Sequence, residues 1–418
     1  MRKHRFVGVG LAGVMAASMA AVAAPVAAQD EVTLDLWNFG AQGFAELLEK
    51  YEAETGVKVN MLSKGYDEHH ESLIPAFASG QVPDIAAVEV GYNSLFKAQP
   101  QNFVDLRTLG VDEIAGDYVD WRWAQGVAPD GTVIGIPTDT GGLAMCYRSD
   151  LFEAAGLPTD RDEVSAAIAT WDGFIDLGTQ YVEATGAPFI DAAAGSVYNV
   201  VKKQGDKEYY EDDGTPIYET SEQNIKAWDT AVAAIEAGLS ANIAQFSPEW
   251  NAAMSNGDFA ALSCPAWMMN YIQGQAPDTA GLWDIAQVPE VGGNWGGTQM
   301  TIPAASDNPQ EAYDLLTWLL SPENQLEVFK LHGNFPSIPA LYESEEVLGF
   351  TNDFFGGAPV GQIYGNSAGA LSPVYEGPQQ RVIDREFGNG LGRIENGEQT
   401  PEEAWASVIE NVKLEVRD

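Results

Sequence analysis

Few residues of this sequence could act as nitrogen or sulfur ligands of a metal. It has two cysteines and four histidines. The run DEHHE (67–71) contains ligand residue types, but adjacent histidines leave a helix on different sides, whereas a zinc site uses a pair at i and i+4. We therefore interpret this run as the solvated start of a helix, and we expect neither a metal nor a cofactor.

Short catalytic and cofactor-binding motifs also occur, but the sequence around them lacks the other features that each one requires. GNSAG (365–369) matches the nucleophile elbow, but that mechanism needs a histidine later in the chain and none follows Ser367. GVGLAG (8–13) matches the dinucleotide fingerprint without a preceding strand. Paired carboxylates for glycoside hydrolysis fit the acidic composition, but no pair is singled out. We expect no catalytic residues and no enzyme, with a secreted glycosidase or esterase as the less favoured alternative.

Aromatic residues are the more informative set, with 11 tryptophans, 15 tyrosines and 17 phenylalanines. A sugar has an apolar C–H face and a rim of hydroxyls, so its receptor needs flat rings together with carboxylates and amides. Tryptophans beside Gly, Pro, Asn or Asp can face a cleft; we favour Trp37, Trp267 and Trp295, and rank Trp121, Trp123 and Trp250 below them. Those at helical or strand spacing predict core packing: Trp171, Trp228, Trp283, Trp318 and Trp405.

The charge excludes several partners. The chain has 61 acidic and 21 basic residues, a formal net charge of −40. Nucleic acid and anionic lipid are bound through Lys and Arg, so we expect neither. A phosphate receptor would place Arg or Lys near its glycines, and GGNWGGT (292–298) has none. A receptor for a cationic solute, such as a polyamine or a peptide, remains an alternative.

The N-terminal 28 residues predict a cleaved signal peptide, with a basic start, an Ala/Gly/Val-rich stretch and small residues before Ala28. No other stretch resembles a membrane span. Export to an oxidising compartment makes a disulfide between Cys146 and Cys264 reasonable, while two buried free cysteines are the other possibility.

The elements that must position these residues begin with a β-α-β-α-β unit. Alternation predicts strands at 32–37, 57–62 and 84–90, with helices at 41–54 and ending near Gly80. Ligands of such open sheets sit beyond the carboxyl ends of the strands, where Trp37-Asn38 and Glu89 to Tyr92 stand. Asn308-Pro309, Ser321-Pro322 and the capping box at 400–403 predict helix starts. The stretches 289–303 and 333–339 predict crossings or loops.

Later strand and helix patterns resemble the first unit again, which favours two lobes around a cleft. Five segments then carry a family resemblance: FAELLEKYEAETGVKV (44–59), FASGQVPDIAAVE (77–89), GTVIGIPTDTGGLAMCYRSDLFEAAGLP (131–158) before TWDGF, NGDFAALSCPAWM (256–268), and NWGGTQMTIPAASDNPQEAYDLLTWLLSPENQ (294–325). In this order they resemble a family-one extracellular solute-binding protein of ATP-binding-cassette importers, of the maltose-binding type. The resemblance covers nearly the whole mature chain.

The resemblance implies an α/β fold of two lobes, each a mainly parallel sheet flanked by helices, that closes on an oligosaccharide and delivers it to a membrane permease. It implies lobe one at 29–138 and 296–335, and lobe two at 139–295 and 336–418. The ligand-binding residues that it and the aromatic pattern imply are Trp37, Asn38, Glu89, Tyr92, Asp139, Trp267, Trp295, Gly296, Gly297 and Asn334.

The two cysteines resemble those of a subgroup associated with β-linked gluco- or xylo-oligosaccharides. Their bridge would hold the strand carrying Trp267 against the lobe-crossing segment at Cys146, so that the ring is presented rigidly. Ala28-Gln29 stands where Gram-positive relatives carry a lipid-modified cysteine. We therefore expect a free periplasmic protein, and we also expect it to be a monomer.

Overall fold

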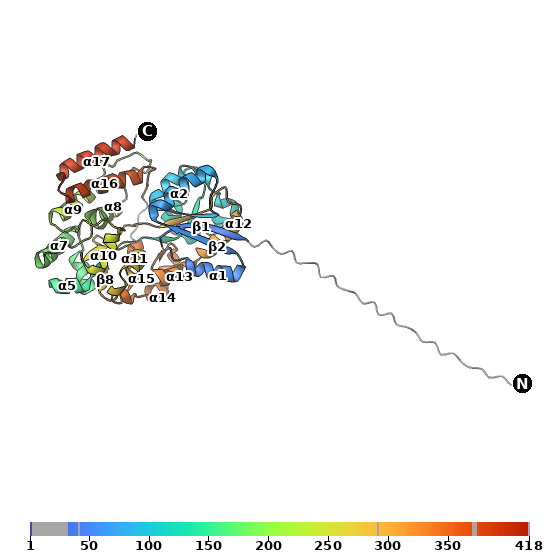
Figure 1. The fold of residues 1–418 in the computed structure, drawn as a ribbon, viewed down its shortest axis with the longest axis horizontal. Helices are drawn as coiled ribbons and strands as arrows, with labels where there is room; N and C mark the ends of the chain where they lie inside the picture. Colours follow the sequence, from blue (N-terminus) through green and yellow to red (C-terminus); the bar gives the residue numbers. More distant parts are fainter. Residues whose placement is uncertain (2–31, 41, 291, 370–373, 417–418) are drawn as a thin grey trace.

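The computed structural model describes Met1 and residues 32–40, 42–290, 292–369 and 374–416. The predicted signal peptide and its cleavage site after Ala28 lie outside the described residues. The described chain forms two α/β lobes that lie side by side (Figure 1). In those residues no helix is long and apolar enough to cross a membrane.

The sheet of lobe one has the order β2-β1-β3-β9-β4. β1 (Thr33–Phe39) pairs in parallel with β2 (Lys58–Lys64) and with β3 (Ile85–Glu89). The helices α1 (Ala45–Thr55) and α2 (Tyr66–Ser79) connect these strands, and Gly80 caps α2 in the left-handed conformation. The predicted β-α-β-α-β unit is confirmed.

The other two strands of this sheet come from the crossing regions. β9 (Thr298–Thr301) lies between β3 and β4 (Gly135–Pro137) and is antiparallel to both. The expectation of a crossing or loop throughout 289–303 was therefore wrong for its last part. The β-branched threonines in TQMT fit a buried strand, although the glycines before them favour a loop.

The sheet of lobe two has the order β7-β6-β8. β6 (Ala144–Arg148) pairs antiparallel with both β7 (Ala261–Ser263) and β8 (Trp283–Gln287). Among the described residues of this lobe, parallel pairing is limited to isolated bridges at Ile190. The expectation of a mainly parallel sheet in each lobe was wrong here, and lobe one is mixed. These three strands are short and largely buried, and their local sequences do not encode the direction of their partners.

A third, two-stranded ladder joins the crossings. β5 (Asp139–Thr140) pairs antiparallel with β10 (Phe335–Pro336), and Gly142 bridges to Asn294. Residues far apart in sequence therefore run together where the chain passes between the sheets.

Helices surround both sheets (Figure 1). With lobe one lie α1, α2, α3 (Val90–Lys97), α4 (Asp120–Gln125), α12 (Pro309–Leu319) and α13 (Pro322–His332). With lobe two lie α5 (Ser149–Ala155), α6 (Arg161–Ala167), α7 (Trp171–Thr185), α8 (Asn199–Lys203), α9 (Glu222–Glu236), α10 (Pro248–Asn256), α11 (Met268–Gln275), α14 (Glu345–Leu348), α15 (Val360–Gly369), α16 (Gln380–Glu395) and α17 (Pro401–Glu415).

The predicted helix starts are confirmed, with one difference in capping. Thr400 and Glu403 form the reciprocal capping box of α17, and Ser321 caps α13. Asn308 occupies the N-cap position of α12, but its side chain makes no capping hydrogen bond.

The central strand β3 of lobe one is buried on both faces, whereas the edge strand β2 is mostly exposed. In β3, Ile85 and Ala87 pack into one apolar cluster of lobe one while Ala86 and Val88 pack into the other. Lobe two also has two clusters, and Cys146 and Cys264 lie in one of them. These cysteines form a disulfide between β6 and the residue after β7, with Cα atoms 5.3 Å apart. The core roles predicted for Trp171, Trp228 and Trp283 are confirmed, since all three are buried.

Candidate functional site

Two of the favoured tryptophans meet on lobe two. Trp267 is the N-cap of α11, and Trp295 precedes the glycine pair at the lobe crossing. Their ring centroids are 5.5 Å apart at 80°, and the indole Nε1 of Trp267 donates to the backbone oxygen of Trp295 at 2.8 Å. Both side chains are partly exposed. The pair therefore forms a fixed aromatic corner.

Trp267 does not lie on a strand, which corrects the sequence expectation. It follows Cys264 by three residues, after β7 has ended. Cys146 lies inside β6 rather than in the crossing itself. The disulfide therefore ties two strands of one sheet together and acts on Trp267 through the short turn that leads to α11.

The glycines at the crossing permit a close approach of backbone and side chains. Gly296 and Gly297 have φ of 90° and 104°, a region that favours glycine. A Cβ on Gly296 would lie 3.0 Å from Nε1 of Trp267, and one on Gly297 would clash with the guanidinium of Arg122. These positions hold the crossing against its neighbours.

Arg122, a residue of lobe one, holds two of the segments at the crossing between the lobes. This fully buried side chain donates from Nε to the backbone oxygen of Asp139 at 2.9 Å and from a terminal nitrogen to Thr298 O at 3.0 Å. Burial lowers the pKa of its guanidinium. A buried cation that bonds to two carbonyls sets the spacing of β5 and β9.

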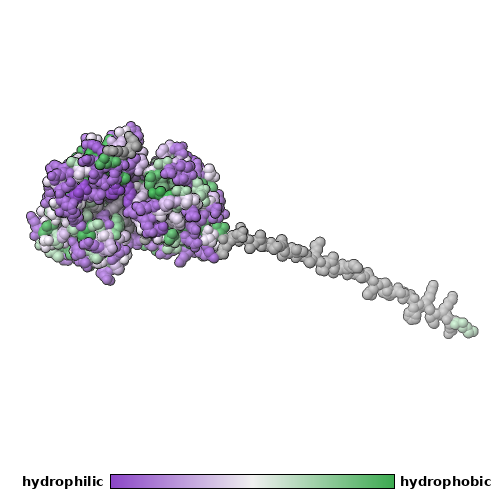
Figure 2. All heavy atoms as spheres, turned by 45° about the horizontal axis from the view of Figure 1, so that its top comes forward, coloured by the Kyte–Doolittle hydropathy of each residue, from purple (hydrophilic) through white to green (hydrophobic). Residues whose placement is uncertain are grey.

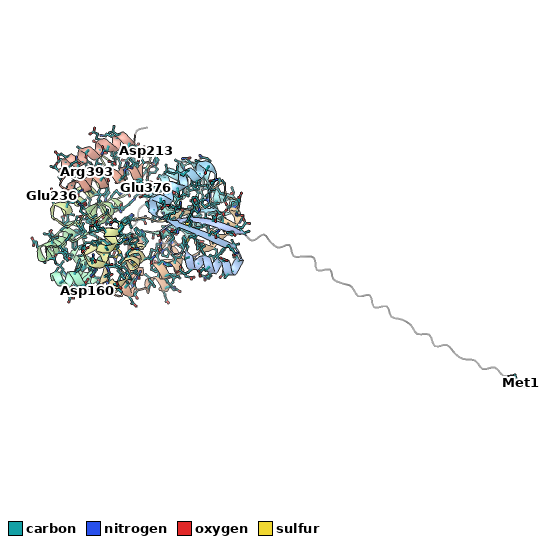
Figure 3. The ribbon with its side chains drawn as sticks, viewed as in Figure 1. Met1, Asp160, Asp213, Glu236, Glu376 and Arg393 are labelled. Atoms are coloured by element: carbon teal, nitrogen blue, oxygen red, sulfur yellow. A yellow bond between two sulfur atoms is a disulfide. The ribbon has the colours of Figure 1, made fainter. Side chains whose placement is uncertain are left out.

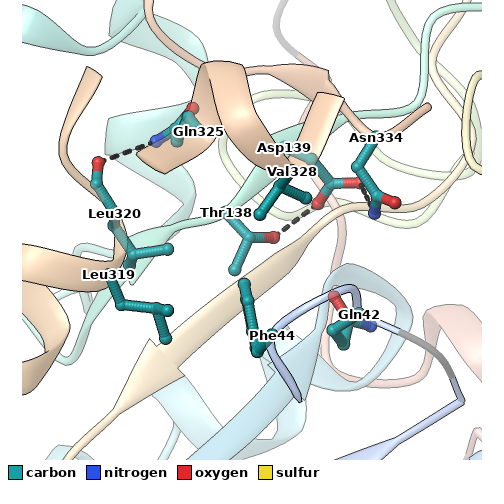
Figure 4. A pocket seen from close by; sticks show the side chains of 9 residues that line it. All are labelled: Gln42, Phe44, Thr138, Asp139, Leu319, Leu320, Gln325, Val328 and Asn334. Atoms are coloured by element: carbon teal, nitrogen blue, oxygen red, sulfur yellow. Dashed lines mark hydrogen bonds between the residues drawn. The ribbon is translucent and has the colours of Figure 1, made fainter. Parts of the chain in front are cut away.

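Asp139 and Asn334 come together beside a small pocket, as Figure 4 shows. Nδ2 of Asn334 donates to Asp139 at 3.4 Å, and the hydroxyl of Thr138 also donates to that carboxylate. The pocket has room for about one water molecule. This space at the lobe junction is too small for a sugar ring, so both residues support the crossing in this conformation.

Glu89 ends β3 and caps α3 at the edge of lobe one. Its carboxylate accepts from the backbone nitrogen of Gly91 at 2.7 Å and from the hydroxyl of Tyr66 at 2.5 Å. Burial raises its pKa to about 7, more than these two hydrogen bonds lower it. Val90 in turn donates to Gly297 O at 3.1 Å, which joins this edge to the crossing.

Tyr92 lies one helical turn further along the same edge. Its ring is parallel to that of His70 with centroids 4.2 Å apart, and its hydroxyl donates to Asp67 at 2.9 Å. Burial raises the pKa of this phenol above its ordinary range. The face of Tyr92 is therefore partly occupied by a lobe-one partner.

The expectation of a solvated helix start at 67–71 was wrong for its two histidines, which are fully buried. His70 contacts Tyr66 O at 2.7 Å through Nδ1, and its Nε2 accepts from the nitrogen of Glu89 at 3.0 Å. Burial lowers its pKa to about 3. His69 contacts Ala87 O at 2.7 Å. They anchor α2 to β3, and no metal-ligating group of three side chains occurs in the described residues.

Lobe two presents charges opposite this edge. Arg381 of α16 ion-pairs with Asp67, and its guanidinium lies 4.5 Å from the ring centroid of Tyr92 and 5.2 Å from that of Tyr66. The backbone oxygen of Glu376 accepts a hydrogen bond from the hydroxyl of Ser94 in lobe one. The carboxylate of Glu376 forms an ion pair with Lys203 of lobe two at 2.8 Å. Figure 3 places Glu376 where the lobes meet, and Figure 2 shows the notch between them.

Two predicted residues lie apart from these groups. Trp37 is inside β1 rather than at its end, packs partly against the cluster around Leu73, and has Nζ of Lys64 5.3 Å from its ring centroid. Asn38 is buried, and its Oδ1 has no hydrogen-bond partner in the described part of the chain. No described contact links either to the aromatic corner.

The three tryptophans that the sequence ranked lower lie in different surroundings. Trp250 is fully buried and donates to Asp191 at 2.8 Å, so the alternative of a cleft-facing ring was wrong for it. Trp123 packs against Tyr118 in the core of lobe one. Arg122 lies 5.8 Å from the ring centroid of Trp121.

Sequence reasoning missed Tyr66, Asp67, Lys203, Glu376 and Arg381. The first two stand at the start of α2, which the β-α-β order places at the carboxyl edge of the sheet. The sequence therefore held enough information to predict these two residues as members of the site. The last three come from lobe two, and nothing in their local sequence shows which residue of lobe one they face.

The comparisons with known proteins agree on one class. Residues 46–353 match the family model of bacterial extracellular solute-binding proteins. The chain is 27% identical to a lactose-binding protein of Rhizobium radiobacter, over 80% of this chain and 81% of that one. It is 24% identical to an arabinooligosaccharide-binding protein of Halalkalibacterium halodurans, over 84% and 81%.

Solved structures give the same fold. An extracellular solute-binding protein of family 1 is 36% identical with a TM-score of 0.81, over 92% of this chain and 99% of that one. A transporter-associated binding protein of B. animalis subsp. lactis, solved with β-1,6-galactobiose, is 23% identical with a TM-score of 0.76, over 91% and 96%.

Proposed function

Because this chain belongs to the bacterial extracellular solute-binding proteins, we propose that it binds a neutral oligosaccharide between its lobes, closes on it and delivers it to the permease of an ATP-binding-cassette importer. The family is one of binding proteins, not of enzymes. We also propose that lobe one is 29–138 with 296–335, and that lobe two is 139–295 with 336–418.

The observation that carries this proposal is the corner of Trp267 and Trp295. Two fixed, partly exposed indoles at 80° give a sugar a face to stack on and a wall beside it. Gly296 and Gly297 lead from this corner to the polar edge of Glu89 and Tyr92. Carboxylate and hydroxyl groups there suit a rim of sugar hydroxyls.

Charge supports a neutral ligand. The lobe-two cations at this edge, Arg381 and Lys203, already pair with Asp67, Glu376 and Glu208. An anionic ligand would have to replace those carboxylates. Relatives named for lactose and arabinooligosaccharide support a sugar, and the disulfide keeps β-linked gluco- or xylo-oligosaccharides as the first ligands to test.

The predicted export determines the location and the partners that we propose. We propose a cleaved signal peptide ending at Ala28 and a free, monomeric periplasmic protein whose partners are its oligosaccharide and the permease. The net charge of −40 opposes binding to nucleic acid.

Thermal-shift screening followed by calorimetry tests the function. The panel contains cello-, xylo- and arabino-oligosaccharides of two to four units, lactose, and spermidine as a cationic probe. We expect a sugar of the panel to raise the melting temperature and bind with one-to-one stoichiometry without product formation. Binding of spermidine alone would identify a cation receptor, and hydrolysis of a sugar would identify a glycosidase.

A further inference from the structure

Phe246 is a third aromatic residue at the corner of Trp267 and Trp295. Its ring centroid lies 6.1 Å from that of Trp267 at 29° and 6.5 Å from that of Trp295 at 74°. The side chain is 48% exposed, unlike the neighbouring Trp250, which is fully buried. An apolar ring thus remains half in solvent beside the candidate sugar site.

The backbone of Phe246 is strained. Its φ is +65°, and it is the second central residue of a turn in which Ser247 N donates to Ala244 O at 3.3 Å. Glycine is the residue favoured at such a position, because a Cβ there is sterically costly. The ring also packs against Trp250 and Tyr271, with centroids 5.2 and 5.5 Å away, which offsets part of this cost. Strain of this kind concentrates at functional sites.

Both sides of the turn are tied to the body of lobe two. Nε2 of Gln245 donates to Asp191 at 2.8 Å, and Trp250 donates to the same carboxylate oxygen at 2.8 Å. Ser247 caps α10 by accepting from Trp250 N at 3.1 Å. Asp191 is fully buried, so this support is rigid and presents the ring in one place.

The spacing determines how the ring could be used. A sugar held between two parallel rings needs about 7–8 Å between them, two carbon contact distances. The 6.1 Å between Phe246 and Trp267 is too short for a sandwich. Phe246 therefore widens the aromatic surface outward, from the fixed corner toward solvent.

We propose that Phe246 is the stacking surface of an outer subsite, which binds the next sugar unit of an oligosaccharide whose first units occupy the corner of Trp267 and Trp295. This inference rests on the proposed function and adds to it a residue that determines preference for ligand length. Short ligands end before this ring and longer ones cover it.

The test measures affinity against ligand length. Phe246→Gly and Phe246→Ala both remove the ring, and calorimetry uses the di-, tri- and tetrasaccharides of the cello-, xylo- or arabino-series that the wild type binds. We expect affinity for tri- and tetrasaccharides to fall roughly threefold to tenfold, the scale of one aromatic contact, while disaccharide affinity stays within twofold. Loss at all lengths, or at none, would overturn the outer subsite.

Two controls keep a folding defect apart from a binding effect. Asn242→Gly changes another residue of positive φ in the same loop and should leave all affinities unchanged. Phe246→Gly should melt above Phe246→Ala, because only glycine relieves the strained backbone, and equal melting temperatures would contradict the strain. If the wild type binds no sugar of the panel, the proposed function itself fails and the subsite with it.

Discussion

At the scale of single residues, Glu89 has two roles that its sequence position alone does not separate. Its carboxylate caps α3, and its burial against Tyr66 raises its pKa to about 7. The carboxyl group of Glu89 is therefore partly protonated at neutral pH. Its neighbour His70 is shifted in the opposite sense, with its pKa lowered to about 3.

The shift of Glu89 predicts a pH dependence of stability. The ordinary pKa is 4.5, so the folded state binds more protons than the unfolded state between about pH 4.5 and 7. Its contribution to stability is complete below pH 4.5 and is lost as pH rises through 7, by about 3 kcal/mol. Glu89→Gln should remove this slope, measured by urea unfolding at several pH values.

His70 provides the internal comparison for that experiment. Its lowered pKa contributes stability that is present above pH 6.5 and is lost as pH falls toward 3. The two slopes oppose each other in the wild type. Glu89→Gln removes the carboxyl contribution and keeps that of His70, so between pH 4.5 and 7 the stability of the variant should rise with pH relative to that of the wild type. Parallel curves for wild type and variant would contradict the shifted carboxyl.

Trp267 carries the most direct prediction about binding. Trp267→Ala removes one face of the corner and should weaken sugar binding by at least about 1 kcal/mol. The control is Trp318→Ala, which removes a partly buried tryptophan that packs on Tyr51 in lobe one, away from the corner. Calorimetry should find unchanged affinity for the control only; unchanged affinity in both would remove Trp267 from the site.

At the scale of elements, the sequence predicted what local patterns encode. Alternation and helical spacing located β1, α1, β2, α2 and β3 to within a few residues. They did not predict β9, since its partners β3 and β4 are more than a hundred residues away in sequence. The antiparallel order of lobe two was missed for the same reason: strand direction depends on contacts between distant segments.

The same distinction holds for the candidate site: residues with a local sequence signal were predicted, and residues that depend on contacts between distant segments were not. Trp267, Trp295 and the glycines were recognisable from residue type and family resemblance. Arg381 was not, because its position opposite Asp67 exists only when α16 and α2 are brought together by the fold. Phe246 was also missed, because a positive φ at a phenylalanine has no sequence signature.

The disulfide is the element whose removal should be most visible. It closes a separation of 118 residues between two buried cysteines. In the chain-entropy model such a loop contributes roughly 4–5 kcal/mol. Cys146→Ala with Cys264→Ala should lower the free energy of unfolding by up to that amount in urea titrations, because the unfolded chain regains its freedom.

The state of the cysteines can be checked on the unaltered protein. Thiol titration of denatured, unreduced protein should find no free thiol. Two reactive thiols would show that the bridge does not form, and a double variant as stable as the wild type would show that it does not stabilise the fold.

At the scale of the whole molecule, the lobes are joined in two different ways. The paired crossings β5 and β10, with Arg122, form the continuous connection. At a separate set of contacts, Arg381 of α16 reaches Asp67, Tyr66 and Tyr92 of lobe one. The second set can separate without breaking the chain path, so it is suited to hold a closed form.

This arrangement predicts that Arg381 controls the balance between open and closed forms. Arg381→Ala removes the ion pair with Asp67 and the contacts with both tyrosine rings, so the open form should gain population. The pair is exposed, with side chains 42% and 58% accessible, so the effect should be modest and should weaken at high salt. Small-angle scattering should find a larger radius of gyration for the ligand-free variant.

Arg385→Ala is the matched control, since Arg385 lies one turn along α16 and pairs with Glu415 outside the interface. Its radius of gyration should equal that of the wild type. A saturating oligosaccharide should compact wild type and Arg381→Ala to the same value, because ligand contacts to both lobes replace the lost ones. Equal radii for all three proteins without ligand would show that Arg381 does not hold the lobes, and an unchanged radius on binding would refute closure.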